Sequence, residues 1–259
     1  MSYLDHDIDL QFLGEMSSKE LEPLVEILTK DKDGKTRYTE NLTKHPKYKQ
    51  YYPDHSKYWE VIGEEIQKFG GNSITNFVRK SGVAYKTILQ DVSDKLSIKY
   101  EKSATTMQIE EAVLLRLIEQ SLDKMSNDEK AHLAREIGVN NLGVISKSAL
   151  LSAFQTIFKL GGFKSYQITL IIANAVLRAI IGRGLTFAGN AALTRSIAVF
   201  AGPIGWTITG AFTTIDLAGP AFRVTIPIVV QIALLRKEYE AQKANLKAQF
   251  EEELQKAGL

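Results

Sequence analysis

The chain has 259 residues, of which 44% are hydrophobic and 24% charged, and its formal net charge is +2. This composition is that of an ordinary globular protein and excludes a disordered chain. The chain contains no cysteine, which excludes disulfides, thiol chemistry and cysteine-ligated metal sites. The N-terminus begins acidic and lacks a basic region followed by an apolar run. We therefore predict no signal peptide and a cytoplasmic protein, with association with the inner membrane left open.

The first predicted helix begins at a capping box. Ser17 is the expected N-cap and Glu20 the residue whose side chain returns to its backbone N–H, and apolar residues follow at helical spacing through Leu28. Residues 31–34 then form a turn. Residues 37–59 are rich in tyrosine, lysine and histidine. We interpret them as a surface connection, because acidic residues and prolines in the segment weaken the alternative of a nucleic-acid-binding site.

The middle of the chain repeats a helical period of apolar residues. Helices are predicted over 59–69, 74–78, 85–96, 107–124, 126–138 and 146–160. Several of these segments end at glycine, as at Gly70, Gly82 and Gly161, which is a common helix stop. The connections are short and no long stretch alternates apolar and polar residues. We therefore predict an all-α protein with a compact helical body.

Residues 166–235 carry four arginines, one aspartate and no lysine. Within them, residues 196–215 are an uncharged run of 20, about the length that crosses a bilayer core of ~30 Å. Residues 224–235 supply 12 more uncharged residues, too few for a second span. We predict a helical hairpin from these two runs. It is either the buried centre of the fold, a membrane-active element or a face for a hydrophobic partner, since a helix enclosed by protein is also apolar all round.

The contact residues of such a hairpin are expected to be its large apolar side chains, and its turn is expected to be fixed by an ion pair. The predicted contact residues are Phe200, Ile204, Trp206, Ile208, Phe212, Ile226 and Val229, and the predicted turn residues are Arg195, Asp216 and Arg223. A charged helix over 236–259 follows, in which Leu246, Phe250 and Leu254 recur every four residues. This helix can pack on the body or pair with another helix, as in an oligomer.

Catalytic signatures are missing from the sequence. It has no G-x-S-x-G nucleophile motif and no phosphate-binding loop, and its four histidines have no metal-ligand spacing. We therefore expect no catalytic residue, no cofactor and no metal. If the chain were an enzyme, the polar loop–helix junction holding Asn72, Ser73 and Arg79 would be the place for its site.

Three ordered segments of the chain carry a family resemblance. They are the N-terminal DIDLQFLGEMSSKELEPLVEILT, the central EEIQKFGGNSITNFVRKSGVAYKTILQDVSDKL and the late SIAVFAGPIGWTITGAFTTIDLAGPAFRVTIPIVVQIALLR. Together they resemble the YaaW-like family of bacterial proteins over nearly the whole chain. The resemblance implies a helical bacterial protein, with an N-terminal segment of unknown function and a part loosely grouped with ubiquinol–cytochrome c chaperones. It implies no catalytic residues.

The sequence thus predicts a multi-helix bundle of amphipathic helices around a central apolar hairpin. We divide it into an N-terminal helix and connection (1–57), a helical body (58–162) and a hairpin with a charged C-terminal helix (163–259). The expected function is that of a non-enzymatic interaction protein whose hairpin engages membrane lipid or a hydrophobic protein, with no nucleic acid partner. The alternative is a soluble chaperone or assembly-type protein with the hairpin as its core.

Overall fold

The computed structural model describes residues 7–31, 33–37, 40–71, 82–139, 146–181 and 222–257. Within these ranges the chain is helical, and the one β pairing is an isolated antiparallel bridge between Lys30 and Thr36. The all-α prediction is confirmed. The elements, with η marking 3₁₀ helices, are η2 (Gln11–Glu15), α1 (Ser18–Thr29), η3 (Leu42–Lys44), α2 (Pro46–Tyr51), η4 (His55–Tyr58), α3 (Trp59–Gly71), α4 (Tyr85–Lys95), α5 (Thr106–Lys124), α6 (Asn127–Glu136), α7 (Lys147–Leu160), α8 (Gly162–Ile181) and α10 (Phe222–Ala257).

Capping boxes begin several of these helices. The hydroxyls of Ser17 and Ser126 each accept a hydrogen bond from the backbone N–H three residues on, and a glutamate at that position returns to the cap N–H. Both capping boxes were predicted and are confirmed. A third one starts α5, where Thr105 and Gln108 make the same pair of contacts. Helix starts in this chain are therefore encoded locally.

Two glycines allow helices to approach closely. A Cβ on Gly70 would lie 2.2 Å from Cγ1 of Ile88, so this residue lets α3 pack against α4. A Cβ on Gly14 would lie 2.8 Å from Cε2 of Trp59, where η2 packs on α3. The sequence predicted that a helix ends at Gly70 and Gly71, and α3 spans Trp59–Gly71. The missing side chain at Gly70 also permits the close contact with α4.

The tyrosine-rich segment forms η3, α2 and η4 and packs against α1 and α3. Tyr48 stacks on Tyr52 with ring centroids 5.1 Å apart and lies 5.4 Å from the ring of Tyr58. Tyr58 is fully buried, and its hydroxyl hydrogen-bonds to Nδ1 of buried His55. Burial lowers the pKa of His55, because the charged imidazolium loses its hydration. This histidine therefore serves packing.

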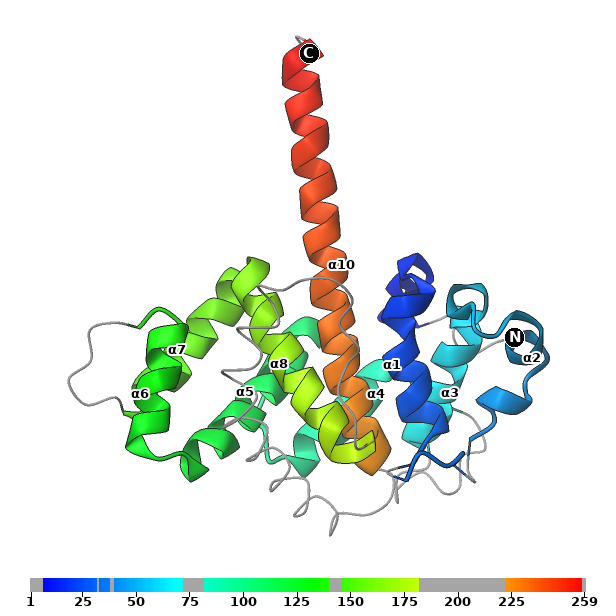
Figure 1. Ribbon diagram of the computed structural model, residues 1–259, viewed down its shortest axis with the longest axis horizontal. Helices are drawn as coiled ribbons and strands as arrows, with labels where there is room; N and C mark the ends of the chain where they lie inside the picture. Colours follow the sequence, from blue (N-terminus) through cyan, green and yellow to red (C-terminus); the bar gives the residue numbers. More distant parts are fainter. Residues whose placement is uncertain are drawn as a thin grey trace.

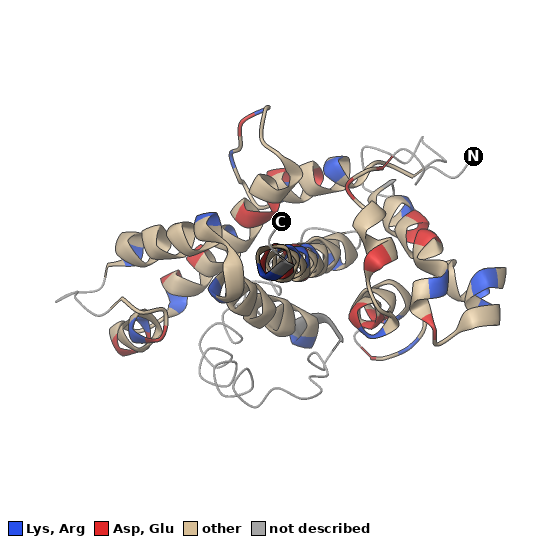
Figure 2. Ribbon diagram, turned by 90° about the horizontal axis from the view of Figure 1, so that it is seen from above, with Lys and Arg blue, Asp and Glu red and all other residues tan. Residues whose placement is uncertain are grey.

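Helix α10 is the central element of the fold. Its lower half lies between α8 and α1 and its upper half rises beyond the body (Figure 1). Seen from above in Figure 2, the end of α10 that is marked C lies in the middle, with the other helices arranged around it. The helix contacts η2, α1, α3, α4, α5 and α8, with α8 the largest contact. At 36 residues it is about 54 Å long.

The structure describes the two ends of residues 166–235, here called the low-charge segment. Helix α8 contains its beginning, residues 222–235 of α10 contain its end, and the two pack side by side. The predicted short arm over 224–235 runs without interruption into the charged C-terminal helix, past Pro227. The longer arm over 196–215 lies outside the described residues. Among those that are described, no helix is long and apolar enough to cross a membrane.

The buried side chains form one hydrophobic cluster. Residues from all three predicted segments contribute to it, for example Leu24 from α1, Leu114 from α5 and Val229 from α10, each fully buried. Because α10 contacts helices of the first two segments directly, these parts are stabilised together. The proposed boundaries near residues 57 and 162 stay a prediction.

Candidate functional site

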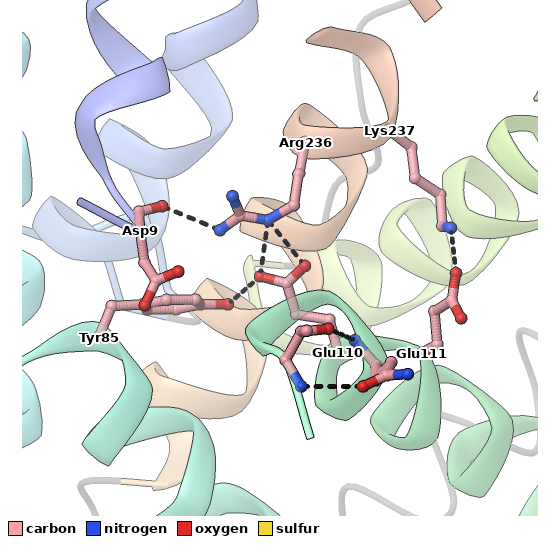
Figure 3. A network of polar contacts seen from close by, with 8 residues as sticks. Asp9, Tyr85, Glu110, Glu111, Arg236 and Lys237 are labelled. Atoms are coloured by element: carbon pink, nitrogen blue, oxygen red, sulfur yellow. Dashed lines mark hydrogen bonds and ion pairs between the residues drawn. The ribbon is translucent and has the colours of Figure 1, made fainter. Parts of the chain in front are cut away.

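Arg236 anchors α10 at the point where this helix leaves the core. Its guanidinium Nε donates to Oε2 of Glu110 at 3.0 Å, and its Nη2 donates to the backbone carbonyl of Asp9 at 2.9 Å (Figure 3). The guanidinium also lies 4.6 Å from the ring centroid of Phe12. One side chain thus joins α10 to α5 and to the N-terminal segment.

Glu110 is the buried member of this ion pair, with 2% of its side chain exposed. Its Oε1 accepts a hydrogen bond of 2.9 Å from the hydroxyl of Tyr85, which is fully buried in α4. Burial raises the pKa of Glu110, and the nearby Arg236 guanidinium opposes that rise. Since both carboxylate oxygens are occupied by protein donors, the arrangement is that of a structural anchor and not of a free general base.

Two further contacts extend the anchor. Lys237 donates to Glu111 at 2.9 Å, which ties the next residue of α10 to the next residue of α5 (Figure 3). Asp7 is buried, and its carboxylate accepts hydrogen bonds of 2.8 Å from the side chain of Gln67 and from the backbone N–H of Tyr85. These contacts connect the N-terminal segment, α3, α4, α5 and α10. We call Asp7, Asp9, Tyr85, Glu110 and Arg236 the α10 anchor.

A hollow of about 210 Å³ lies beside the anchor, between α10 and the corner where α7 turns into α8. Gly161 and Gly162 form the corner with φ of 66° and 70°, a conformation that favours glycine. Leu160 and Phe163 flank them and are 79% and 61% exposed. We call these four residues the α7–α8 corner. The hollow is lined by the two glycines together with Ser165, Lys237, Glu240, Ala241 and Ala244.

The Ser165 side chain is a polar group at this hollow. The residue is 1% exposed, and its hydroxyl makes no hydrogen bond within the described part of the chain. A buried hydroxyl without a partner is unfavourable by about 1–3 kcal/mol. The hollow therefore combines apolar walls, a charged edge at Glu240 and one buried hydroxyl that lacks a hydrogen-bond partner among the described residues.

The projecting part of α10, residues 240–257, is here called the stem. Its exposed apolar residues Leu246 and Phe250 are 68% and 60% exposed. They continue a face that starts at Tyr239, whose ring packs 5.6 Å from Phe12 and whose hydroxyl donates to Glu15 at 2.7 Å. The stem face, Tyr239–Lys243–Leu246–Phe250, has the helical spacing of four, three and four residues.

The stem face and the hollow lie on nearly opposite sides of α10. On α10 the hollow is lined by positions 237, 240, 241 and 244, and the stem face uses positions 239, 243, 246 and 250. Positions 239, 243 and 246 each follow a hollow position by two residues, which is a rotation of about 200° around the helix. The two surfaces can therefore be occupied independently.

A pair of acidic side chains lies at the base of the stem. The carboxyl groups of Glu238 and Glu20 are neighbours, and Gln242 donates to Glu20 at 3.0 Å. Burial, together with the neighbouring charge of Glu20, raises the pKa of Glu238 to about 7. Tyr166 of α8 lies near the same pair, and burial raises its pKa to about 12. This pair makes the base of the stem sensitive to pH near neutrality.

The structure describes three of the ten predicted contact and turn residues. Ile226 and Val229 are fully buried in the core, where they contribute packing and are not accessible to lipid or a partner. Their burial favours the alternative in which this part of the segment is core. Arg223 is exposed in the first turn of α10. The other predicted residues, Arg195, Phe200, Ile204, Trp206, Ile208, Phe212 and Asp216, lie outside the described ranges, as do Asn72, Ser73 and Arg79.

The anchor was missed from the sequence, although part of it leaves a signal. Glu110 lies on the same face of α5 as Val113, Leu114 and Leu117, so a charged residue interrupts an apolar stripe. Such a residue requires a partner, because an unpaired buried charge is strongly destabilising. The partner, Arg236, lies 126 positions away in the sequence. Nothing near Glu110 in the sequence identifies it.

Metal-binding groups are not evident where the structure is described. Across 7–31, 33–37, 40–71, 82–139, 146–181 and 222–257, no group of three or more histidine, cysteine, aspartate or glutamate side chains could hold a metal ion. The expectation that the chain has no metal and no cofactor stays a prediction.

Comparisons with known proteins identify the family. Residues 5–38 match a family model described as a domain of unknown function, DUF3944, and residues 54–230 match one described as Ubiquinol-cytochrome C chaperone. A UPF0174 protein of Helicobacter pylori J99 is 45% identical over 240 residues, which cover 93% of this chain and 94% of that protein. The UPF0174 protein YaaW of Escherichia coli K12 is 31% identical over 245 residues, covering 93% and 98%.

No solved structure matches the chain. The resemblance inferred from the three sequence segments is confirmed, since both the family model and the relatives extend over most of the chain. This protein therefore belongs to the UPF0174 family of bacterial proteins, the family of YaaW.

Proposed function

We propose that this protein is a non-enzymatic assembly protein that binds a protein partner at the α7–α8 corner. The observation that carries the proposal is the pairing of exposed Leu160 and Phe163 with the hollow against α10. Large apolar side chains exposed together at the edge of a hollow are typical of protein interaction sites.

The size of the hollow favours a protein partner over a small-molecule substrate. At about 210 Å³ it is smaller than the ~300–1,000 Å³ of most small-molecule sites. An apolar side chain of a partner would enter between Leu160 and Phe163. A polar group next to that side chain would hydrogen-bond to the hydroxyl of Ser165, whose burial is otherwise uncompensated.

The family comparison supports the same class of function. The model that matches residues 54–230 is described as a chaperone, which is a protein that acts by binding another protein. Residues 168–177 of α8 and residues 224–235 of α10 are buried, so these parts of the low-charge segment serve as core, as the chaperone or assembly alternative requires. Engagement of a membrane by residues 196–215 stays a second prediction, tested below.

A photo-crosslinking amino acid at position 163 tests the proposal in living cells. We expect one discrete protein adduct at Phe163, and its loss when Leu160→Ser is added. The matched control is the same amino acid at Gln155, an exposed position elsewhere on α7, where we expect no such adduct. Equal adducts at both positions, or none at Phe163, would contradict a partner site at the corner.

Vesicle flotation separates this function from membrane engagement. Purified protein is mixed with vesicles of phosphatidylethanolamine and phosphatidylglycerol and centrifuged through a density gradient. An assembly protein stays at the bottom. Flotation that Ile204→Asp abolishes without unfolding the protein would instead assign the activity to residues 196–215.

A further inference from the structure

We propose that a second copy of this chain packs antiparallel on the stem face, so that the protein is a dimer joined through α10. The dimer uses the side of the helix opposite the hollow and does not depend on the proposed function of the α7–α8 corner. The two copies would be related by a two-fold axis passing near Phe250, which makes the contact self-complementary.

The first support is the apolar character of the stem beyond the body. An isolated helix of this length is marginally stable in water, and an exposed Phe250 and Leu246 add no stabilisation unless another surface covers them. Leu246, Phe250 and Leu254 follow one another every four residues. This spacing forms a ridge inclined to the helix axis, and two such ridges pack with helices crossing at about 50°. The stem face thus suits a short contact with an identical helix.

The distribution of charge selects the antiparallel orientation. The stem carries Lys243 and Lys247 near the body and Glu251, Glu252 and Glu253 further out. With the axis near Phe250, Lys247 of each copy lies opposite Glu253 of the other in an antiparallel pair. In a parallel pair, Lys243 would face Lys243 and Glu253 would face Glu253, which is repulsive.

The body at the base of the stem complements the far end of a second copy. With the axis near Phe250, Lys256 of the second copy reaches the level of Ala244, about 3 Å along the axis from Gln242. Gln242 contacts Glu20, and Glu15 contacts Tyr239 on the same side of α10. Lys256 of the second copy therefore lies near acidic groups of the first copy, and each projecting helix packs against the body of the other copy.

Sedimentation equilibrium of the full chain over a range of concentrations tests the dimer. We expect Phe250→Ser to weaken dimerisation by about 100-fold, because each dimer loses two buried phenylalanines. Lys247→Glu should give a monomer, because it places a second glutamate opposite Glu253, and mixing it with Glu253→Lys should restore a dimer of the two variants. Asn245→Ser, on the exposed opposite side of the stem, is the matched control and should leave the dimer unchanged. A monomeric wild-type protein, or a dimer that Phe250→Ser does not weaken, would overturn the proposal.

Cysteine cross-linking tests the orientation, because the natural chain contains no cysteine. In the antiparallel dimer, two copies of Lys243→Cys lie about 20 Å apart along the axis and should not be joined by a short bismaleimide. A mixture of Lys243→Cys and Glu253→Cys should cross-link. Efficient joining of Lys243→Cys to itself would overturn the antiparallel arrangement. Circular dichroism of each variant checks that the helical fold is kept.

Discussion

Residues 222–235 and residues 240–257 belong to the same helix, yet they are stabilised in different ways. In the first half, Ile226, Val229 and Ile232 are fully buried among α8 and the other helices of the body. In the second half, Leu246 and Phe250 are 68% and 60% exposed. The first half is stabilised by removing apolar surface from water, at about 25 cal/mol per Å².

The second half depends on interactions within the helix itself. Lys247 and Glu251 form an i,i+4 ion pair at 3.8 Å, and Glu252 and Lys256 form another at 2.7 Å. Such pairs contribute only about 0.3–0.5 kcal/mol each. One continuous helix thus joins a rigid core to an accessible surface. The α10 anchor marks the boundary between the two.

The same substitution placed in each half should give the largest contrast. Val229→Asp should unfold the protein, since an unpaired buried carboxylate costs several kcal/mol, comparable to the stability of a whole domain. Leu246→Asp should change the unfolding free energy of the body by less than about 0.5 kcal/mol. Urea unfolding followed by circular dichroism measures both. Similar losses in the two variants would show that the halves are not energetically distinct.

The boundary itself is tested by breaking the anchor. Arg236→Met should destabilise the protein by about 3–5 kcal/mol, because Glu110 is left as an uncompensated buried charge. Adding Glu110→Leu should recover much of this loss, since a buried ion pair can often be replaced by apolar residues. The measurement is a double-mutant cycle from urea unfolding. Simply additive losses would argue that the two side chains do not act as a pair.

The base of the stem should respond to pH. The pKa of Glu238 is raised to about 7 in the folded protein from 4.5 in a free chain, so the folded state binds a proton that the unfolded state releases. Its stabilising contribution is complete below pH 4.5 and is lost as the pH rises through about 7. Allowing for solvent screening at this partly exposed site, we expect a loss of about 1–2 kcal/mol.

Glu238→Gln is the control for that pH dependence, because the amide can still contact Glu20 and cannot titrate. The unfolding free energy of each protein is measured at pH 5 and at pH 8. Its decrease between these two pH values should be smaller in the variant than in the wild-type protein. The same pH dependence in both proteins would assign it to other groups.

The smallest effect is expected within the stem. Glu252→Ala removes the exposed ion pair with Lys256, on the side of the helix away from the stem face, and should lower the helix stability of the stem only slightly, by about 0.3–0.5 kcal/mol. Hydrogen exchange of the stem amides measures this effect. The difference between the two proteins should be largest at low salt and should shrink at about 1 M salt, where the exposed ion pair is screened. A loss of several kcal/mol would show that this pair contacts something besides its own helix.

Local sequence patterns were sufficient to predict the fold class and several helix starts. Ser17 and Ser126 begin helices through contacts within three residues, so the relevant physics is contained in a short window. The apolar faces of α3 and α5 were likewise visible, because Ile62 and Leu114 recur with their neighbours at helical spacing and are fully buried. These features do not depend on what the helices pack against.

Other features depend on distant parts of the chain and could not be predicted. Gly70 also lets Ile88 of α4 approach α3 closely, and nothing in the local sequence indicates that contact. Leu246 and Val229 are both apolar residues at helical spacing, and only the surrounding helices make one exposed and the other buried. The corner residues Leu160 and Phe163 were not selected for the same reason: their exposure is a tertiary property.

The length of the stem has a mechanical consequence. Phe250 lies 14 residues beyond Arg236, so a sideways load at Phe250 acts on an arm of about 20 Å. The fulcrum of this lever is the α10 anchor, and its other arm, of equal length, is the half of the helix held among α3, α4, α5 and α8. Displacement at the tip is thereby converted into torque on Glu110, Tyr85 and the N-terminal segment. The polar contacts at the anchor, and not the apolar core alone, resist that torque.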